Sequence, residues 1–154
     1  MNAIFLDIDG VLNSIESLYN HNLNHEVEID IYKLLLLKEL IDETNSLVVL
    51  SSSWRIGITI TGGKITSKSD FHDDFLSLLG MYGITLYDRT PSIEGNRTKE
   101  IHAYLKMHPE IDNYIILDDE YVDDPNLIQT SYYTDGLTKE HINLAISKLS
   151  SRLR

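Results

Sequence analysis

Pairs of acidic side chains directly follow two short apolar segments of the sequence. Asp7 and Asp9 come after the run AIFL, and Asp118 and Asp119 come after the run YIIL. Because alternate residues of an extended chain point to the same side, Asp7 and Asp9 can both project to one side of a strand end. Two carboxylates this close repel each other unless a cation lies between them. Mg²⁺ binds carboxylate oxygens together with water and substrate phosphate, so these residue types indicate a magnesium site for a phosphorylated substrate.

Residues suited to binding a phosphoryl group lie in the middle of the sequence. Ser51 or Ser52, after the apolar run LVVL, can donate hydroxyl and backbone N–H groups to a phosphoryl oxygen. Lys99 or Arg97 stands at the start of an expected helix, where either can neutralise the phosphate charge. The N-terminus of that helix adds a positive end of its own. The sequence does not choose between the two members of either pair.

Short apolar runs that alternate with helical patterns must position these side chains. Strands are expected at residues 3–7, 47–50, 84–87, 114–117 and 127–130, and a hairpin at 59–66. Helices are expected at residues 30–43, 70–81 and 98–107 and after 138, with Asp30 and Thr138 as capping residues. Apolar strands with helical crossovers indicate a parallel sheet covered on both faces, and such sheets bind ligands beyond the carboxyl ends of their strands. We therefore predict an α/β fold, a single-domain Rossmann-like three-layer sandwich over residues 1–154 with a mostly parallel sheet.

Composition and charge narrow the class of protein. The 154 residues are roughly one domain's length. The absence of cysteine excludes disulfides, thiolate zinc sites and a cysteine nucleophile. The net charge of −11 disfavours broad nucleic-acid binding, although residues 55–106, with 7 basic and 6 acidic side chains, leave room for a local phosphate site. No apolar run reaches the ~18 residues of a membrane span and no basic leader is present, so a cytoplasmic protein that does not bind a membrane is expected. The sequence also gives no sign of an obligate protein partner.

Four segments resemble the four motifs of the haloacid dehalogenase (HAD) superfamily. They are FLDIDGVLNS, VVLSSSW, the basic residues of NRTKEIHAYL, and IILDD, in this order along the chain. The resemblance extends from residue 3 to the GLT of residues 136–138. The chain looks most similar to the small HAD domains found alone and attached to RNA-repair proteins, which share the SSSWR run and a late GLT.

The resemblance implies a nucleophile and a general acid. Asp7 would form an aspartyl-phosphate, and Asp9 would protonate the leaving group and then activate water. Phosphatases of the superfamily carry an acid at the position of Asp9, whereas its ATPases carry threonine and its dehalogenases lack this aspartate. The aspartate at position 9 therefore favours a phosphatase.

The remaining groups are assigned by the resemblance to phosphate and metal binding. Ser51 would hold the phosphoryl group, Lys99 or Arg97 would balance its charge, and Ser52 and Gly10 would also contact the substrate. An arginine in this place is not equivalent to a lysine, so both residues are retained. The expected magnesium ligands are Asp7, Asp9 through its backbone carbonyl, Asp118 and Asp119.

The short insertions between motifs indicate that no cap domain covers the site. About twenty residues separate Gly10 from Asp30, and residues 54–66 hold at most a hairpin. An open site favours substrates that are themselves large and exclude water, such as an oligonucleotide end or a phosphoprotein. The basic residues expected to rim the site and contact further phosphates are Arg55, Lys64, Arg89, Arg97 and Lys99.

The predicted function is that of an Mg²⁺-dependent phosphomonoesterase acting on a large or nucleic-acid-end phosphate. The alternatives are a non-catalytic HAD-like binding protein, or a phosphatase for a small phosphometabolite or a phosphoprotein. A receiver-type signalling domain is disfavoured. In a receiver domain the acidic pair follows the first strand and the phosphoacceptor aspartate follows the third, whereas in this chain a second acidic pair follows the fourth strand. Trp54 is expected to pack in the interior, with stacking on a base as the alternative.

Overall fold

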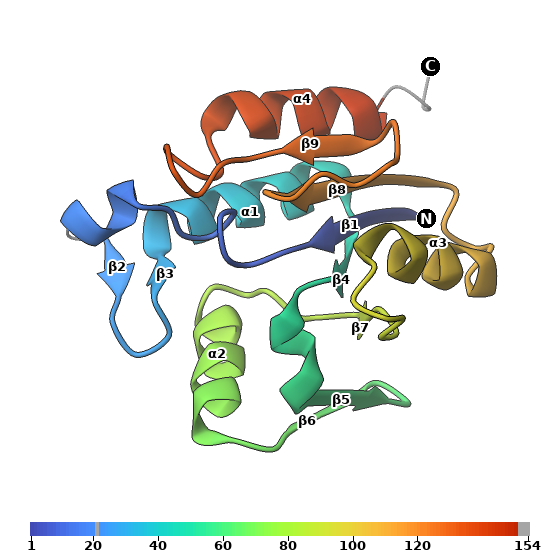
Figure 1. The fold of residues 1–154 in the computed structure, drawn as a ribbon, viewed down its shortest axis with the longest axis horizontal. Coiled ribbons are helices and arrows are strands. Elements are labelled where there is room, and N and C mark those ends of the chain that lie inside the picture. The colour runs from blue at the N-terminus through green and yellow to red at the C-terminus, as the bar shows by residue number, and fades with distance from the viewer. Residues whose placement is uncertain (21, 151–154) are drawn as a thin grey trace.

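A five-stranded parallel sheet forms the centre of the structure (Figure 1). In spatial order its strands are β7 (Asp88–Arg89), β4 (Leu47–Leu50), β1 (Asn2–Leu6), β8 (Asn113–Asp118) and β9 (Leu127–Gln129). The computed structural model describes residues 1–20 and 22–150, so residues 151–154 of the predicted domain lie outside the described residues. Because β1 pairs with both β4 and β8, the segments that follow these three strands lie side by side at one edge of the sheet.

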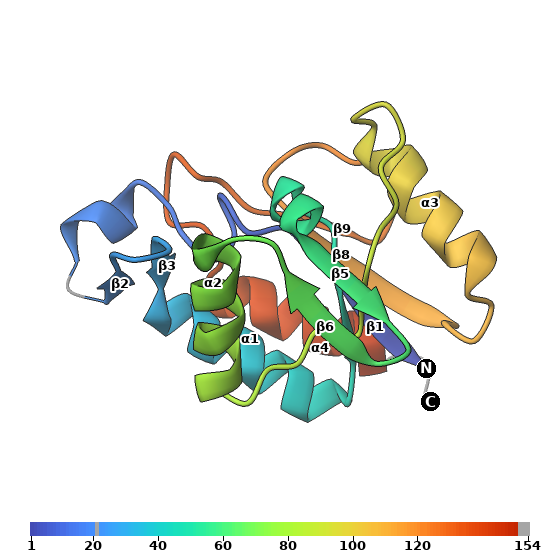
Figure 2. The ribbon, with the colours of Figure 1, turned by 90° about the horizontal axis from the view of Figure 1, so that it is seen from below.

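Alternating side chains of the central strand face two layers of helices. The helices are α1 (Ile31–Thr44), α2 (Asp70–Met81), α3 (Arg97–Met107) and α4 (Lys139–Ser150). Ile4 and Leu6 pack in the larger core with α1, α2 and α4, whereas Ala3 and Phe5 pack against α3 on the other face. Figure 2 shows α3 on the side of the sheet away from α1 and α4. Each fully buried isoleucine, leucine or phenylalanine side chain contributes roughly 1.5–3 kcal/mol. The predicted three-layer α/β fold is confirmed.

The helices begin at capping side chains. The carboxylate of Asp30 accepts a hydrogen bond from the backbone N–H of Tyr32, and the Thr138 hydroxyl accepts one from that of His141, as the sequence predicts. Asn96 caps α3 by accepting from the backbone N–H of Lys99. This cap starts α3 at Arg97, so Arg97 and Lys99 both lie in the first turn of the helix.

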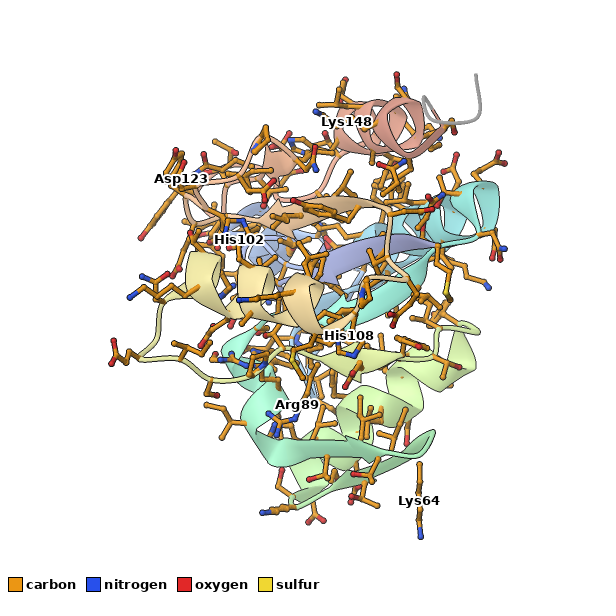
Figure 3. All side chains as sticks on the ribbon, turned by 90° about the vertical axis from the view of Figure 1, so that its right-hand side faces the viewer. Lys64, Arg89, His102, His108, Asp123 and Lys148 are labelled. Atoms are coloured by element: carbon orange, nitrogen blue, oxygen red, sulfur yellow. The ribbon has the colours of Figure 1, made fainter. Side chains whose placement is uncertain are left out.

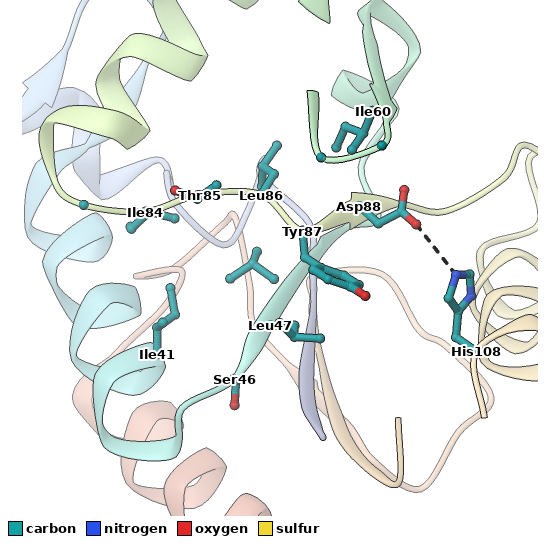
Figure 4. Close-up of a pocket in the computed structure, with 14 residues that line it drawn as sticks. Ile41, Ser46, Leu47, Ile60, Ile84, Thr85, Leu86, Tyr87, Asp88 and His108 are labelled. Carbon is teal, nitrogen blue, oxygen red and sulfur yellow. Dashed lines mark ion pairs between the residues drawn. The ribbon is translucent and has the colours of Figure 1, made fainter. Parts of the chain in front are cut away.

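The third strand differs from its prediction. Residues 84–87 form no strand, and the pairing with β4 is made by β7, where Val49 stands opposite Asp88. Ile84 and Leu86 are nevertheless buried in the larger core. The apolar pattern that predicted a strand is explained by this burial. A segment at the edge of a sheet can bury its side chains without pairing with the neighbouring strand along its whole length. A pocket of about 510 Å³ lies beside this segment (Figure 4).

The insertions between the motifs are small. After β1 come the 3₁₀ helix η1 (Glu16–Tyr19) and the strands β2 (Leu23–Asn24) and β3 (Ile29–Asp30). After β4 come the 3₁₀ helix η2 (Ser53–Gly57) and the hairpin of β5 (Ile58–Thr61) and β6 (Lys64–Ser67), which is the predicted hairpin. Neither insertion builds a cap domain within the described residues, as expected. In this part of the chain, no helix combines the length and the apolar character that crossing a membrane requires.

Candidate active site

Three of the predicted acidic residues meet at the carboxyl ends of β1 and β8. One carboxylate oxygen each from Asp7, Asp118 and Asp119 lies within 4.8 Å of the other two. Asp7 and Asp118 are buried and Asp119 is half-buried. The backbone N–H of Asp7 donates to the carbonyl of Leu117 at 3.0 Å, which joins the two strand ends. We call these three residues the acidic cluster.

The acidic cluster is electrostatically unfavourable without a cation. Burial and the neighbouring Asp118 raise the pKa of Asp7 to about 9, and Arg97 only partly offsets them. Burial also raises the pKa of Asp118, against the attraction of Arg97. A bound divalent cation would keep these carboxylates ionised. Because all three side chains offer oxygen, the donor set fits a hard cation such as Mg²⁺.

The structure places Arg97, and not Lys99, beside the acidic cluster. Arg97 Nη1 lies 2.5 Å from Asp118 Oδ2 and 3.6 Å from Asp7 Oδ1. Lys99 is exposed, and its side chain forms no ion pair or hydrogen bond with the residues that the structure describes. Two residues further along a helix point roughly 200° away, so only one of the two can face the cluster.

A buried carboxylate behind Arg97 connects α3 to the segment after β4. Glu100 is 1% exposed and accepts hydrogen bonds from Arg55 Nη2 at 2.7 Å and from the backbone N–H of Ile93 at 2.9 Å. Arg55 Nη1 also donates to the carbonyl oxygen of Ser52 at 2.8 Å. The expectation that Arg55 rims the site is therefore wrong, because Arg55 is the buried partner that Glu100 needs. The Glu100 Oε1 atom lies 4.0 Å from Arg97 Nε.

The two candidate serines occupy different environments. Ser51 follows β4 in register with Asp7, and its backbone N–H donates to the carbonyl of Leu6 at 2.8 Å. Its hydroxyl is buried and has no hydrogen-bond partner among the described residues. The hydroxyl of Ser52 accepts from the backbone N–H of Trp54 and caps η2. The Ser51 hydroxyl is thus the one left for a ligand, since a buried unpaired hydroxyl costs about 1–3 kcal/mol.

Asp9 stands apart from the acidic cluster. Its side chain is exposed, and its two oxygens accept hydrogen bonds from Trp54 Nε1 and Asn13 Nδ2, each at 3.0 Å. The predicted metal contact of Asp9 is through its backbone carbonyl and stays a prediction. Trp54 packs against Phe71 and Phe75, as expected, and its hydrogen bond to Asp9 was not predicted from the sequence. The one sequence signal for a role of Trp54 at the active site is its position directly after the serine run.

Gly10 shapes the loop that carries the first motif. Its φ of +84° is a conformation that side chains rarely adopt, and a Cβ atom there would lie 2.2 Å from Asp119 Oδ2. Its carbonyl accepts from the Thr130 hydroxyl at 2.6 Å, and its N–H donates to Asn13 Oδ1 at 2.9 Å. The structure thus explains a glycine here through close approach to the acidic cluster, and a substrate contact of Gly10 stays a prediction.

The GLT segment, noted in the sequence without a role, braces the same loop. The backbone N–H of Leu137 donates to the carbonyl of Val11 at 3.0 Å. The buried ammonium of Lys33 donates to the carbonyls of Asp135 and Leu137. A Cβ on Gly136, whose φ is +56°, would lie 3.0 Å from the carbonyl oxygen of Asn13. Lys33 of α1 therefore holds the GLT segment, which in turn holds the loop after β1 in place.

The predicted basic rim does not form as expected. Lys64 stands next to the turn at residues 62–63, which lines the 510 Å³ pocket together with residues 46–47 at the amino end of β4 (Figure 4). In Figure 3, Lys64 and Asp123, near the end of β8, lie at opposite sides of the molecule. The rim role of Lys64 is wrong, because the hairpin folds back along the sheet edge. Arg89 is half-buried and lines a second pocket of about 410 Å³.

The parallel sheet, with an acidic pair after each of two adjacent strands and a serine after a third, defines an α/β domain of the HAD superfamily. Residues 3–142 match the family model of the HAD domain in Swiss Army Knife RNA repair proteins, and the chain belongs to this family. The resemblance seen in the sequence is thereby confirmed. Searches of curated proteins and of solved structures found no match.

Proposed function

We propose that this protein is an Mg²⁺-dependent phosphomonoesterase that acts through an aspartyl-phosphate. HAD domains are generally hydrolases or phosphatases, and the acidic cluster with Arg97 against it is the observation that carries the proposal. The hydroxyl of Ser51, which has no hydrogen-bond partner among the described residues, also supports the proposal, because Ser51 follows β4 and β4 pairs with the strand that precedes Asp7. Bound Mg²⁺ would supply positive charge to the nucleophile and the phosphoryl oxygens and would be held by Asp7, Asp118 and Asp119.

The reaction divides between Asp7 and Asp9. A carboxylate oxygen of Asp7 attacks phosphorus, the bond from phosphorus to the leaving oxygen breaks, and Asp9 gives its proton to that oxygen. Asp9 then takes a proton from water, whose oxygen attacks the aspartyl-phosphate. Inorganic phosphate leaves and the Asp7 carboxylate is restored. Arg97 and the Ser51 hydroxyl face the phosphoryl oxygens, on which the transferred charge is spread.

Turnover of p-nitrophenyl phosphate should require Mg²⁺, and Ca²⁺ should inhibit it. Ca²⁺ accepts longer bonds and more oxygen ligands, so it can draw the second oxygen of Asp7 into coordination and remove the nucleophile from its attack geometry. The measurement is the initial rate with Mg²⁺, with excess EDTA, and with Mg²⁺ plus increasing Ca²⁺. Full activity in EDTA would refute the metal dependence, and no turnover under any condition would favour the non-catalytic binding protein.

For the substrate, we propose a terminal phosphate of an RNA strand. The description of the family as a domain of RNA repair proteins supports this choice, and so does the lack of a cap domain in the described residues. Because Arg55 is buried and Lys64 lies at the far end of its hairpin, few cations are left for neighbouring phosphates. On this proposal a phosphorylated oligonucleotide should exceed the matching mononucleotide in kcat/KM. Because few cations meet its other phosphates, this preference should depend only weakly on salt.

A screen can decide on this substrate class. It compares 3′- and 5′-phosphorylated oligonucleotides with mononucleotides, sugar phosphates and phosphopeptides at low and moderate salt. A higher kcat/KM for one oligonucleotide end supports the proposal. Equal kcat/KM on oligonucleotide and mononucleotide would instead favour a small phosphometabolite as the substrate. A preference for phosphopeptides would favour a phosphoprotein.

A further inference from the structure

The carboxylate of Asp9 is held in place although it is exposed. One oxygen accepts from the indole N–H of Trp54 and the other from the side-chain amide of Asn13, both at 3.0 Å. An exposed aspartate is ordinarily free to change its side-chain rotamer. With a donor on each oxygen, rotation of the Asp9 side chain breaks at least one hydrogen bond.

The Trp54 donor is itself fixed by its surroundings. The indole ring lies 4.8 Å from the ring of Phe71 and 5.0 Å from that of Phe75, measured between centroids. The carbonyl oxygen of Trp54 lies 2.9 Å from His72 Nε2, and a Cβ on Gly57 would lie 2.2 Å from the His72 ring. The 3₁₀ helix η2 is therefore packed tightly against α2, so the indole N–H keeps its direction.

The Asn13 side chain is fixed because both the oxygen and the nitrogen of its amide form hydrogen bonds. Asn13 is buried, and its Oδ1 accepts from the backbone N–H of Gly10 at 2.9 Å. Its Nδ2 donates to Asp9 and to the carbonyl of Glu28, at 3.0 Å each. Glu28 adopts a φ of +54°, which is uncommon for a residue with a side chain. A flipped amide would lose all three hydrogen bonds.

We infer that Trp54 and Asn13 are positioning residues that hold Asp9 where its proton passes to the leaving oxygen. The inference rests on the proposed function and adds two residues to it, neither of which belongs to the acidic cluster. Proton transfer needs the acid within hydrogen-bond reach of the leaving oxygen. The indole of Trp54, which packs on α2, and the amide of Asn13, in the loop after β1, keep the Asp9 carboxyl group in this position.

Trp54→Phe tests the inference, because phenylalanine keeps an aromatic ring against Phe71 and Phe75 but removes the N–H. With an alkyl phosphate, whose leaving group needs a proton, kcat should fall about tenfold while KM changes little. With p-nitrophenyl phosphate, whose leaving group needs little protonation, the loss should stay within about twofold. In an Asp9→Asn background, which should itself lose most on the alkyl phosphate, Trp54→Phe should have no further effect.

Phe71→Leu is the matched control. It loosens the same aromatic packing without removing a donor to Asp9, so any loss should be equal for the two substrates. Losses from Trp54→Phe that are equal for both substrates, or that add to those of Asp9→Asn, would overturn the inference. A wild-type protein without turnover on any phosphate would instead overturn the proposed function.

The hydrogen bond can also be tested without turnover. Trp54 is the single tryptophan of the chain, so the protein has one indole N–H signal in a ¹⁵N–¹H spectrum. Asp9→Ala should shift this signal and speed its exchange with solvent, whereas Asp123→Asn, at an exposed position, should leave it unchanged. An indole signal that Asp9→Ala does not alter would overturn the inference whether or not the protein is active.

Discussion

Asp7→Asn is expected to abolish phosphatase activity and to leave the fold intact. The amide of asparagine is a poor nucleophile, so no covalent intermediate forms, and the rate should fall by about 10⁴-fold or more. Asparagine has nearly the same shape as aspartate and fits the buried position after β1. The measurement is turnover of p-nitrophenyl phosphate by wild type and variant, with circular dichroism to confirm folding.

The same substitution should raise the melting temperature of the metal-free protein. The pKa of Asp7 is raised from 3.8 to about 9, so the folded state holds a proton that the unfolded state has lost. Between these two values the folded state binds more protons, and the free energy of unfolding falls as the pH rises. The asparagine of the variant does not titrate, so the gain in melting temperature should be larger at about pH 8 than at about pH 5.

Two outcomes would contradict these expectations. Retained hydrolysis by a clean preparation of the variant would show that Asp7 is not the nucleophile. A lower melting temperature of the variant than of the wild type in excess EDTA would show that the Asp7 carboxylate stabilises the metal-free fold. Asp123→Asn serves as the control, because it removes one negative charge from an exposed residue that follows the neighbouring strand β8.

The placement of the acidic cluster was predictable from the sequence because it depends on strand ends alone. The runs AIFL, LVVL and YIIL are too apolar to lie anywhere but in the sheet, and the residues after them must emerge at its carboxyl edge. Asp7, Ser51 and Asp118 follow from this argument without any knowledge of tertiary contacts. The GLT segment could be noted but not explained, since its hydrogen bonds reach a loop more than a hundred residues away.

Long side chains were harder to predict, because their direction depends on tertiary partners. Arg55 was expected at the surface, but its guanidinium pairs with the buried Glu100, a residue that its position on α3 turns inward. Lys64 was expected near the site because it follows the second motif, but a hairpin can return along the sheet in either direction. The residues 84–87 were expected as a strand because burial and strand pairing leave the same apolar pattern.

The choice between Arg97 and Lys99 required the structure, and it leads to the second large effect. Arg97→Ala should lower kcat/KM for p-nitrophenyl phosphate by about 10²–10³-fold, because it removes the guanidinium that faces both Asp7 and Asp118 and would meet the phosphoryl oxygens. Lys99→Ala, on the opposite side of the same helical turn, should change it less than about twofold.

Arg97→Lys separates charge from geometry. A lysine keeps the positive charge but cannot reproduce the planar guanidinium, which also lies 4.0 Å from the buried Glu100, so we expect only partial recovery of kcat/KM relative to Arg97→Ala. Loss of activity in Lys99→Ala together with full activity in Arg97→Ala would reverse the assignment. Such a result would require the first turn of α3 to rotate on substrate binding, and the Asn96 hydrogen bond to the backbone N–H of Lys99, at 3.0 Å, opposes that rotation.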